Sequence, residues 1–352
     1  MLMKRFSVLL LALVLVLSGC GQKAVETQIF AMDTVMELTA YGSGGKRAVA
    51  GAEDAIRSLE AMLDRTSDQS EVSALNGAAG TPAAVSQTLA ELLRAALNYA
   101  GATGRSFDVT IAPVMDAWGF TKDRQQVPDR ALLDALLPLV DSRLVTLEES
   151  AGGAAVTLAE GQAVDLGGIA KGYVSDCVEA VFRQNGVESG KISLGGNIYV
   201  QGGKPDGSAW RVGVRDPRNE SGFAGILSLS DGYAVTSGGY ERYFTQDGKT
   251  YHHIIDPSTG YPADSGLLSV TVVADANGPS EGIAPGNGAM CDAFSTALFV
   301  MGEEAALDFW RSGAYDFDLV LVTEDGRVLV TDGLESRFEE CEESGYAYEI
   351  VH

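Results

Sequence analysis

The sequence predicts an α+β fold of mainly antiparallel sheets flanked by helices. Segments in which apolar and polar residues alternate, as in strands, outnumber segments with helical periodicity. These strand segments often follow one another through short turns, which is typical of hairpins and not of βαβ units. Apolar residues form 46% of the 352 residues, enough for a large core, and no Pro- or Ser-rich linker divides the chain. We therefore expect a single interleaved unit.

The first residues resemble a bacterial lipoprotein signal. Lys4 and Arg5 precede an apolar run over 6–17 that is too short to span a bilayer comfortably, and Cys20 follows Leu-Ser-Gly. This pattern predicts cleavage before Cys20 and its lipidation with acyl groups such as palmitate. The alternative is an ordinary signal peptide in which the cysteine is incidental.

The lipoprotein signal sets the expected organisation of the chain. Residues 1–19 would be a signal peptide, 20–27 a polar tether, and 28–352 the folded domain. We accordingly expect the mature protein to be lipid-anchored in the cell membrane, on its extracytoplasmic face.

The net charge of −23 excludes one class of partner. Removing Lys4 and Arg5 would take it to about −25, and nucleic-acid binding needs a basic surface instead. After Cys20, the cysteines are Cys177, Cys291 and Cys341, without metal-site spacing, so at most one disulfide can form among them.

The periodicity of apolar residues predicts the helices and strands, and Gly, Pro and Asn residues mark where they end. Apolar residues at helical spacing predict helices over 48–63, 86–100, 129–140, 174–185, 292–301 and 303–312, the second with Ser86 as its N-cap. Alternating or β-prone runs predict strands over 28–41 (broken at 32–34), 144–147, 154–158, 191–200 (broken at 195–197), 210–214, 224–229, 233–236, 252–255, 267–274, 317–323 and finally 327–331.

The stretch from Val164 to Asp176 combines a carboxylate, a bare backbone and a cation. Asp165 is followed by Gly167 and Gly168 and then by Lys171. The stretch joins a predicted strand to a predicted helix, where free N–H groups and the helix dipole favour an anion such as a phosphate. The alternative is a tight turn with both glycines at positive φ and a solvated lysine.

Two further groups could carry chemistry. Asp292 and Thr296 are four residues apart on a predicted helix, so their oxygens face the same way and could hold a hard cation such as Mg2+. Alternatively, Asp292 caps that helix.

His252 and His253 are neighbours in a strand and point to opposite faces, so one alone could contact a phosphate or transfer a proton. The alternative for that histidine is a surface position.

Seven motifs occur in a fixed order between about residues 28 and 323. They read Met-Asp-Thr at 32, Phe-Asp-Val-Thr at 107, Asp-Leu-Gly-Gly-Ile-Ala-Lys-Gly-Tyr at 165, Leu-Gly-Gly-Asn at 194, Thr-Ser-Gly at 236, His-Ile-Ile-Asp-Pro-Ser-Thr-Gly-Tyr-Pro at 253 and Asp-Ala-Phe-Ser-Thr at 292. Together they resemble the ApbE-type FAD:protein FMN transferases. The order of seven motifs is far more specific than any one of them.

The resemblance implies an ApbE-like single catalytic unit with FAD as substrate and Mg2+ as cofactor. Such an enzyme splits the FAD pyrophosphate, moves FMN onto a threonine or serine hydroxyl of an extracytoplasmic acceptor protein, and releases AMP. The resemblance assigns the metal to the carbonyl of Gly168 and the side chains of Asp292 and Thr296. It assigns FAD contacts to Met32, Ser106, Phe107, Asp108, Asp165, Lys171 and His253.

The catalytic roles implied for these residues are electrostatic. Lys171 or His253, with the metal, would neutralise charge on the transferring phosphoryl group. Asp292 or Asp165 could take the proton from the acceptor hydroxyl. Two alternatives stay open: an FAD pyrophosphatase that yields FMN and AMP, and a lipoprotein that only binds flavin. Two departures from the family pattern are a long loop over 277–288 and Thr66, where some relatives carry an aromatic residue facing the flavin.

Overall fold

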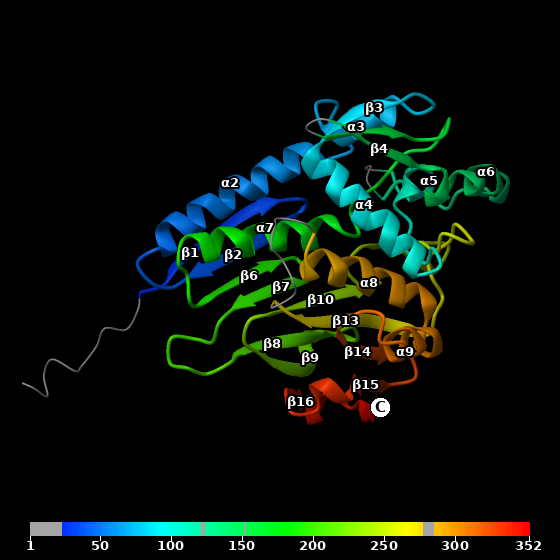
Figure 1. Ribbon diagram of the computed structural model, residues 1–352. Helices are drawn as coiled ribbons and strands as arrows, with labels where there is room; N and C mark the ends of the chain where they lie inside the picture. The colour runs from blue at the N-terminus through cyan, green and yellow to red at the C-terminus, as the bar shows by residue number, and fades with distance from the viewer. Residues whose placement is uncertain (1–22, 121–123, 151–152, 277–284) are drawn as a thin grey trace, which may run out of the picture.

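The computed structural model describes residues 23–120, 124–150, 153–276 and 285–352 (Figure 1). The predicted signal peptide 1–19, Cys20 and most of the 277–288 loop lie outside these residues. The first strand, β1, begins at Val25. The regular structure therefore starts inside the segment 20–27 that was predicted to be a tether.

The predicted α+β class is confirmed by a large sheet covered by helices. Within the described residues, this sheet has nine strands in the order β1-β2-β6-β7-β10-β13-β14-β15-β17. Its neighbours are antiparallel except for β15 and β17, which are parallel. The strands are β1 Val25–Ala31, β2 Thr34–Ala40, β6 Gly190–Leu194, β7 Asn197–Gln201, β10 Gly232–Gly238, β13 Leu267–Asp275, β14 Asp318–Thr323, β15 Arg327–Thr331 and β17 Ala347–Val351.

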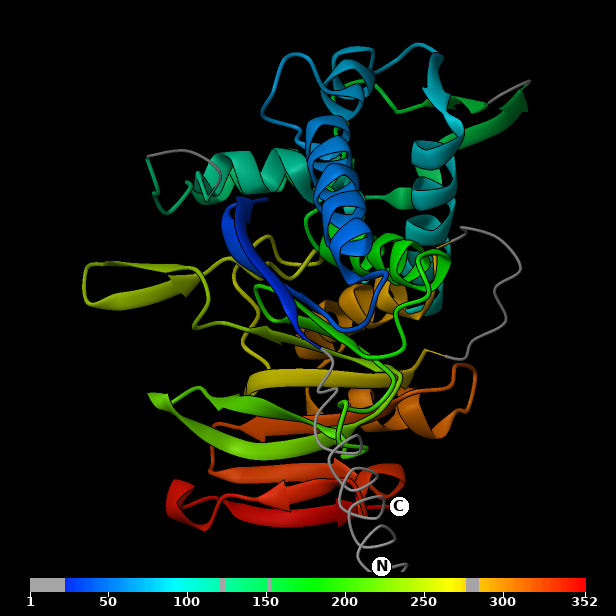
Figure 2. The same cartoon turned by 90° about the vertical axis from the view of Figure 1, so that its left-hand side faces the viewer.

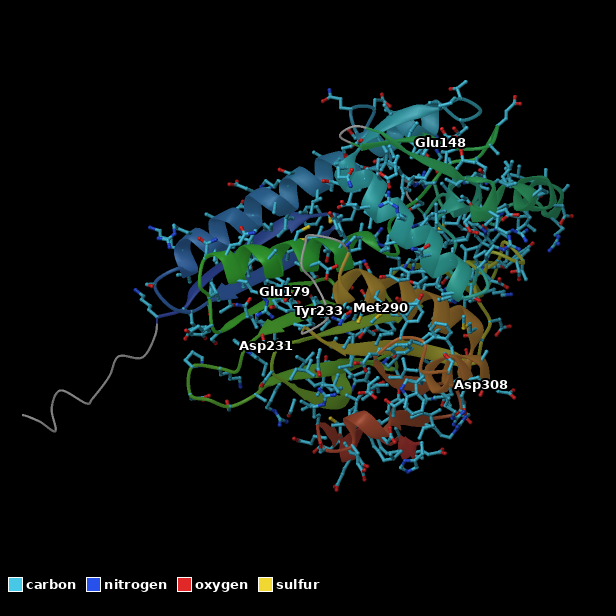
Figure 3. All side chains as sticks on the ribbon, viewed as in Figure 1. Glu148, Glu179, Asp231, Tyr233, Met290 and Asp308 are labelled. Carbon is cyan, nitrogen blue, oxygen red and sulfur yellow. The ribbon has the colours of Figure 1, made fainter. Side chains whose placement is uncertain are left out.

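Three helices cover one face of this sheet (Figures 1 and 2). They are α2 (Gly45–Leu63), α7 (Ala170–Gln184) and α8 (Asn287–Met301), and they pack on β1–β2, β7 and β10–β13 respectively. Their buried apolar side chains form the main core with those of the sheet. One polar contact ties α7 to the sheet: the Tyr233 hydroxyl of β10 donates to Glu179 of α7 (Figure 3).

A second, smaller sheet covers part of the opposite face. Its strands are β8 (Trp210–Asp216), β9 (Asn219–Leu229) and β16 (Phe338–Glu340), in the order β16-β9-β8. A separate apolar core lies between the two sheets, with buried residues from β7, β10, β13, β14 and β15. Within the described residues, this packing leaves Phe30 of β1 and Val35 of β2 exposed on that face.

The remaining elements form a cap beside the helices. The cap contains a third sheet and four helices. The strands of this sheet, in order, are β3 (Ala83–Ser86), β5 (Gly153–Thr157) and β4 (Thr146–Ser150). The helices are α3 (Glu71–Gly77), α4 (Gln87–Ala102), α5 (Ala112–Trp118) and α6 (Arg130–Leu136). The β11–β12 hairpin (Tyr243–Gln246 and Lys249–His252) projects separately and packs its aromatic side chains on Trp118. The short helix α9 (Glu303–Arg311) follows α8.

Several predicted boundaries were wrong. Helix α7 begins at Ala170 and not at residue 174, α6 ends at Leu136 and not at residue 140, and β12 ends at His252, where the strand predicted over 252–255 was expected to begin. Helix α8 begins at Asn287 and not at residue 292, because the Gly- and Asn-rich residues before Asp292 already turn as a helix. Strand 327–331 does not end the fold, since β16 and β17 follow it. None of the helices in the described ranges is both long and apolar enough to cross a membrane.

Candidate active site

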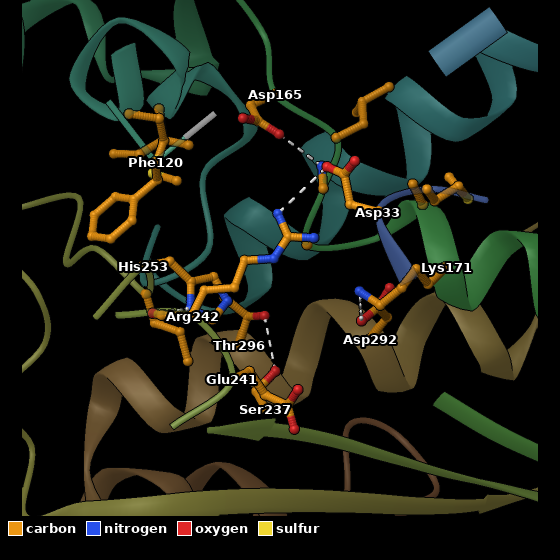
Figure 4. Close-up of a pocket in the computed structure, with 18 of the residues that line it drawn as sticks. Asp33, Phe120, Asp165, Lys171, Ser237, Glu241, Arg242, His253, Asp292 and Thr296 are labelled. Carbon is orange, nitrogen blue, oxygen red and sulfur yellow. Dashed lines mark hydrogen bonds and ion pairs between the residues drawn. The ribbon is translucent and has the colours of Figure 1, made fainter. Parts of the chain in front are cut away.

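One pocket contains every residue that the family resemblance assigns to the metal or to FAD. Its volume is about 540 Å³, and it opens between the β1–β2 turn, the end of α2, the turn before α7 and the N-terminal half of α8 (Figure 4). The predicted residues that line it are Met32, Ser106, Phe107, Asp108, Asp165, Gly168, Lys171, His253, Asp292 and Thr296. The structure therefore brings together residues that lie up to about 260 positions apart in the chain.

Asp292 connects α8 to the start of α7. Its buried carboxylate accepts a hydrogen bond from the Gly172 N–H through Oδ2 at 2.9 Å, and its Oδ1 lies 4.0 Å from Nζ of Lys171. The carboxylate thus caps α7 and not its own helix. The Gly172 N–H is therefore already hydrogen bonded and is not free to bind a phosphate at the start of α7, as the sequence had suggested.

A glycine is required where α7 and α8 meet. A Cβ on Gly172 would lie 2.1 Å from the Gly288 carbonyl oxygen and 2.7 Å from Cβ of Asp292. Either contact would push the two helices apart and move Asp292. In the turn before α7, Gly167 and Gly168 do not have positive φ, so the tight-turn alternative is wrong. Gly168 packs closely on Phe107, since a Cβ there would lie 3.1 Å from the ring and the ring would have to shift by a few tenths of an ångström.

Thr296 lies against the same turn. A Cβ on Gly168 would be 3.6 Å from Oγ1 of Thr296, so the backbone of the turn approaches the hydroxyl closely. Ser237 of β10 lies 3.2 Å from that hydroxyl and 2.8 Å from Oγ of Ser295. Ser237 belongs to the Thr-Ser-Gly motif, for which the sequence suggested no role. The structure shows that it orients Thr296.

The donors at this end of the pocket fit a hard divalent cation. They are one buried carboxylate (Asp292), one hydroxyl (Thr296) and the backbone of the turn at Gly168. Across the described ranges, no three His, Cys, Asp or Glu side chains gather as a metal site. A set with a single carboxylate suits Mg2+, which keeps waters and shares oxygens with a bound phosphate.

Arg65 is a site residue that the sequence analysis missed. Its Nε donates to Oδ2 of Asp165 at 2.7 Å, and Nη1 and Nη2 donate to Oδ1 of Asp116 at 3.1 Å. Oδ1 of Asp165 accepts a hydrogen bond from the Gly167 N–H at 2.8 Å. Both oxygens of Asp165 are therefore held in place. The partners lie 51 and 100 residues from Arg65, so no local pattern could reveal them.

The two histidines separate as predicted. His253 lines the pocket, while Nε2 of His252 lies 3.0 Å from the Ala263 carbonyl oxygen and its ring packs on Phe299. The pKa of His253 is lowered to about 4, mainly by burial and also by the nearby charges of Arg242 and Lys171, although its hydrogen bond with the Arg242 carbonyl raises it. His253 is thus neutral near pH 7. Of the two predicted cations, Lys171 is the one that carries charge there.

The β1–β2 turn forms one side of the pocket mouth. Met32 and Asp33 both have positive φ, 49° and 59°, in a two-residue hairpin turn that usually takes Asn-Gly. The Met32 N–H donates to Oε1 of Glu60 at 2.6 Å, which holds this strained backbone. Arg242, which the sequence did not suggest, reaches from the opposite side to within 3.7 Å of Oδ2 of Asp33.

Thr66 does not supply an aromatic contact in the pocket. Thr66 lines the pocket, and its hydroxyl donates to Asp64 at 2.6 Å. Aromatic surface in the pocket comes instead from Phe107 and Phe120. Cys177, Cys291 and Cys341 are free, and Cys291 is buried in α8, where burial raises the pKa of its thiol.

A family model, curated relatives and a solved structure all relate this chain to the same family. The model of the ApbE family matches residues 32–320. An FAD:protein FMN transferase of Klebsiella pneumoniae is 34% identical over 83% of this chain and 86% of its own length, and one of Treponema pallidum is 34% identical over 80% and 78%. The crystal structure of the ApbE protein of Thermotoga maritima superposes with a TM-score of 0.81 at 29% identity, covering 90% of this chain and 99% of that one. The chain belongs to the ApbE family.

Proposed function

We propose that this chain is a Mg2+-dependent FAD:protein FMN transferase. It would move FMN from FAD onto a threonine or serine hydroxyl of an extracytoplasmic acceptor protein. The observation that carries this proposal is the convergence of Asp292, Thr296, Gly168 and Lys171 at one end of a pocket of about 540 Å³. Relatives that cover most of the chain bear the same name for their activity.

The reaction exchanges one phosphorus–oxygen bond for another. The acceptor oxygen bonds to the phosphorus of the FMN half, and the bond from that phosphorus to the bridging oxygen breaks. AMP leaves with the bridging oxygen, and the hydroxyl proton passes to a base. Charge that develops on the phosphoryl oxygens and on the leaving group is the main obstacle to such a transfer.

Several residues of the chain would help to neutralise this charge. Asp292, Thr296 and the carbonyl of Gly168 would hold Mg2+, whose chemistry when bound is to neutralise phosphate oxygens. Lys171 adds a positive charge beside Asp292. Neutral His253 can form hydrogen bonds but supplies no charge at neutral pH.

Two carboxylates were candidates for the base. Both oxygens of Asp165 are engaged, one by Arg65 and the other by the Gly167 N–H. Asp165 therefore suits the binding and orientation of FAD. Both oxygens of Asp292 also have partners, the Gly172 N–H and the Lys171 ammonium, so the geometry does not favour Asp292 over Asp165 as the acceptor of the proton.

Replacing Arg65 tests the orientation of Asp165. Arg65→Ala should weaken FAD binding roughly tenfold, because it removes the Nε–H that holds Oδ2 of Asp165 in a partly buried site. FAD fluorescence titration gives the Kd. Arg65→Lys, which keeps the charge but loses the planar fork, should fall between the two. An unchanged Kd in Arg65→Ala would show that Arg65 does not support the flavin site.

The lipid anchor at Cys20 is a separate part of the proposal, supported by the basic, apolar and Leu-Ser-Gly-Cys segments of the signal. Cys20→Ala removes the thiol that would carry the acyl groups, so the protein should lose the lipid mass and, once its signal peptide is removed, leave the membrane fraction. Fractionation and the intact mass of the mature N-terminus measure this. A Cys20→Ala protein that fractionates and weighs as before would exclude lipidation at Cys20.

A further inference from the structure

The β1–β2 hairpin exposes an apolar pair that its own core does not use. Phe30 and Val35 lie directly opposite each other in the register of the two strands, and they are 67% and 57% exposed. The alternate residues Ile29, Ala31 and Met36 are buried with the core beneath α2. Since neighbours along a strand point to opposite faces, Phe30 and Val35 face away from α2. We call Phe30 and Val35 the rim pair.

Within the described residues, the sheet face stays exposed at the rim pair. The small sheet β16-β9-β8 packs farther along, over β7, β10, β13, β14 and β15. Beside the rim pair on the same face lie Gln28 and Glu37, which hydrogen bond to each other at 2.9 Å. In the described part of the chain β1 pairs with β2 alone and forms the edge of the large sheet. An edge strand offers unpaired N–H and C=O groups to another chain.

The rim pair stands at the mouth of the active-site pocket. The three residues of the turn between Ala31 and Val35, which are Met32, Asp33 and Thr34, all line that pocket. The turn is tied to the body by the Met32–Glu60 hydrogen bond and approaches Arg242 across the mouth. Figure 2 shows the β1–β2 and β11–β12 hairpins, in dark blue and yellow-green, reaching toward the same side of the molecule. The position of the rim pair is therefore fixed relative to the pocket.

We propose that the rim pair and the free edge of β1 form the docking surface for the acceptor protein. The occupant is an extended segment of that protein, with an apolar side chain a few residues from its reactive hydroxyl. This inference rests on the proposed transfer of FMN to a protein. Phe30 and Val35 do not line the pocket, so FAD bound there does not need them. A protein acceptor, in contrast, must bring its hydroxyl through the mouth beside them, and strand addition with an apolar anchor is a common way to bind such a segment.

The test is a double substitution at the rim pair. The acceptor used is a domain to which the wild-type chain adds the mass of FMN. The kinetics of this transfer are measured for the wild type and for the full chain carrying both Phe30→Ser and Val35→Ser. Loss of the apolar contact should raise the KM for this acceptor by roughly tenfold to a hundredfold. The kcat at saturating acceptor and the Kd for FAD should stay within about twofold, because the pocket is untouched.

A matched control and the adverse outcomes make the test decisive. Leu144→Ser removes an apolar side chain that is 47% exposed and lies beside a different hollow, so it should leave the acceptor KM unchanged. An unchanged KM in the double variant, or an equal rise in Leu144→Ser, would overturn the inference. So would a wild-type dimer that the double variant loses, since the surface would then bind a second copy. If the wild type labels no acceptor, the proposed function itself fails before the variants are compared.

Discussion

Replacing Asp292 with alanine is expected to lower kcat/KM for FMN transfer by at least about a thousandfold. Asp292 is the one carboxylate of the proposed metal site, it lies 4.0 Å from the Lys171 ammonium, and it accepts the Gly172 N–H of α7. The substitution removes the charge that would hold the cation and leaves a buried amide without its acceptor. Release of AMP from FAD, followed with excess Mg2+ and acceptor, measures the loss.

Asp292→Asn separates the chemical role from the structural one. The asparagine keeps the size of the side chain and an oxygen that can accept the Gly172 N–H, but it removes the negative charge. We expect this variant to unfold at nearly the wild-type temperature and still to lose most of its activity. Activity within about tenfold of the wild type in Asp292→Asn would remove Asp292 from the metal site.

Replacing Asp176 with alanine is expected to lower the free energy of unfolding by about 3–5 kcal/mol. This buried carboxylate of α7 accepts three backbone N–H groups at the start of α8, from Gly286 at 2.8 Å, Gly288 at 2.8 Å and Ala289 at 3.0 Å. Alanine would leave these donors unpaired and open a cavity beside them. Urea unfolding followed by circular dichroism measures the change.

The effect of Asp176 should also reach the active site. Helix α8 carries Asp292 and Thr296 within its next turns, so a loosened start would lower activity even in the folded protein. Asp206→Ala is the matched control, because Asp206 is an exposed aspartate whose hydrogen bonds, among the described residues, go to Ser208 two positions along the chain. That variant should change the stability by less than about 0.5 kcal/mol. A loss below about 1 kcal/mol in Asp176→Ala would show that the α7–α8 contact does not depend on this carboxylate.

The same residue gives the protein a pH-dependent stability. Burial raises the pKa of Asp176 to about 7, although its three amide donors and Tyr233 lower it. An unfolded chain releases this proton near pH 4, so between about pH 4 and 7 the folded state binds more protons than the unfolded state. This group therefore costs stability as the pH rises through that window. Asp176→Asn should lack that part of the slope.

Elements with a strong local pattern were predictable from the sequence. Helices α2 and α4 were expected from their amphipathic periodicity, and Ser86 does cap α4 by accepting the Leu89 N–H. The break at Met32–Thr34 became the β1–β2 turn. Each of these depends on neighbours in the chain, so local residues suffice.

Elements that depend on distant partners were not predictable in this way. Strand β17 is partly exposed and pairs in parallel with β15, an arrangement that its own residues do not indicate. The start of α8 lies in a Gly-rich segment that resembles a loop and is stabilised by Asp176, more than 100 residues earlier. Tertiary contacts override local preference at both places.

In the candidate site, too, some residues could be predicted from the sequence and others could not. The motif order indicated ten lining residues because the family pattern already carries long-range information. Arg65 and Ser237 act through Asp165 and Thr296, and their roles appear only when the chain is folded. The neutral state of His253 likewise depends on burial and on two cations from other segments.

The central claim is that the pocket transfers FMN from FAD to a protein hydroxyl. The most direct measurement incubates the full chain with FAD and Mg2+, with and without an acceptor domain, and follows AMP, FMN and the intact mass of the acceptor together. We predict that the acceptor gains the mass of FMN while AMP is released in equal amount, and that chelation of Mg2+ stops both. Equal release of FMN and AMP without any labelled acceptor would contradict transfer and indicate a pyrophosphatase. FAD that binds but stays intact would contradict catalysis altogether.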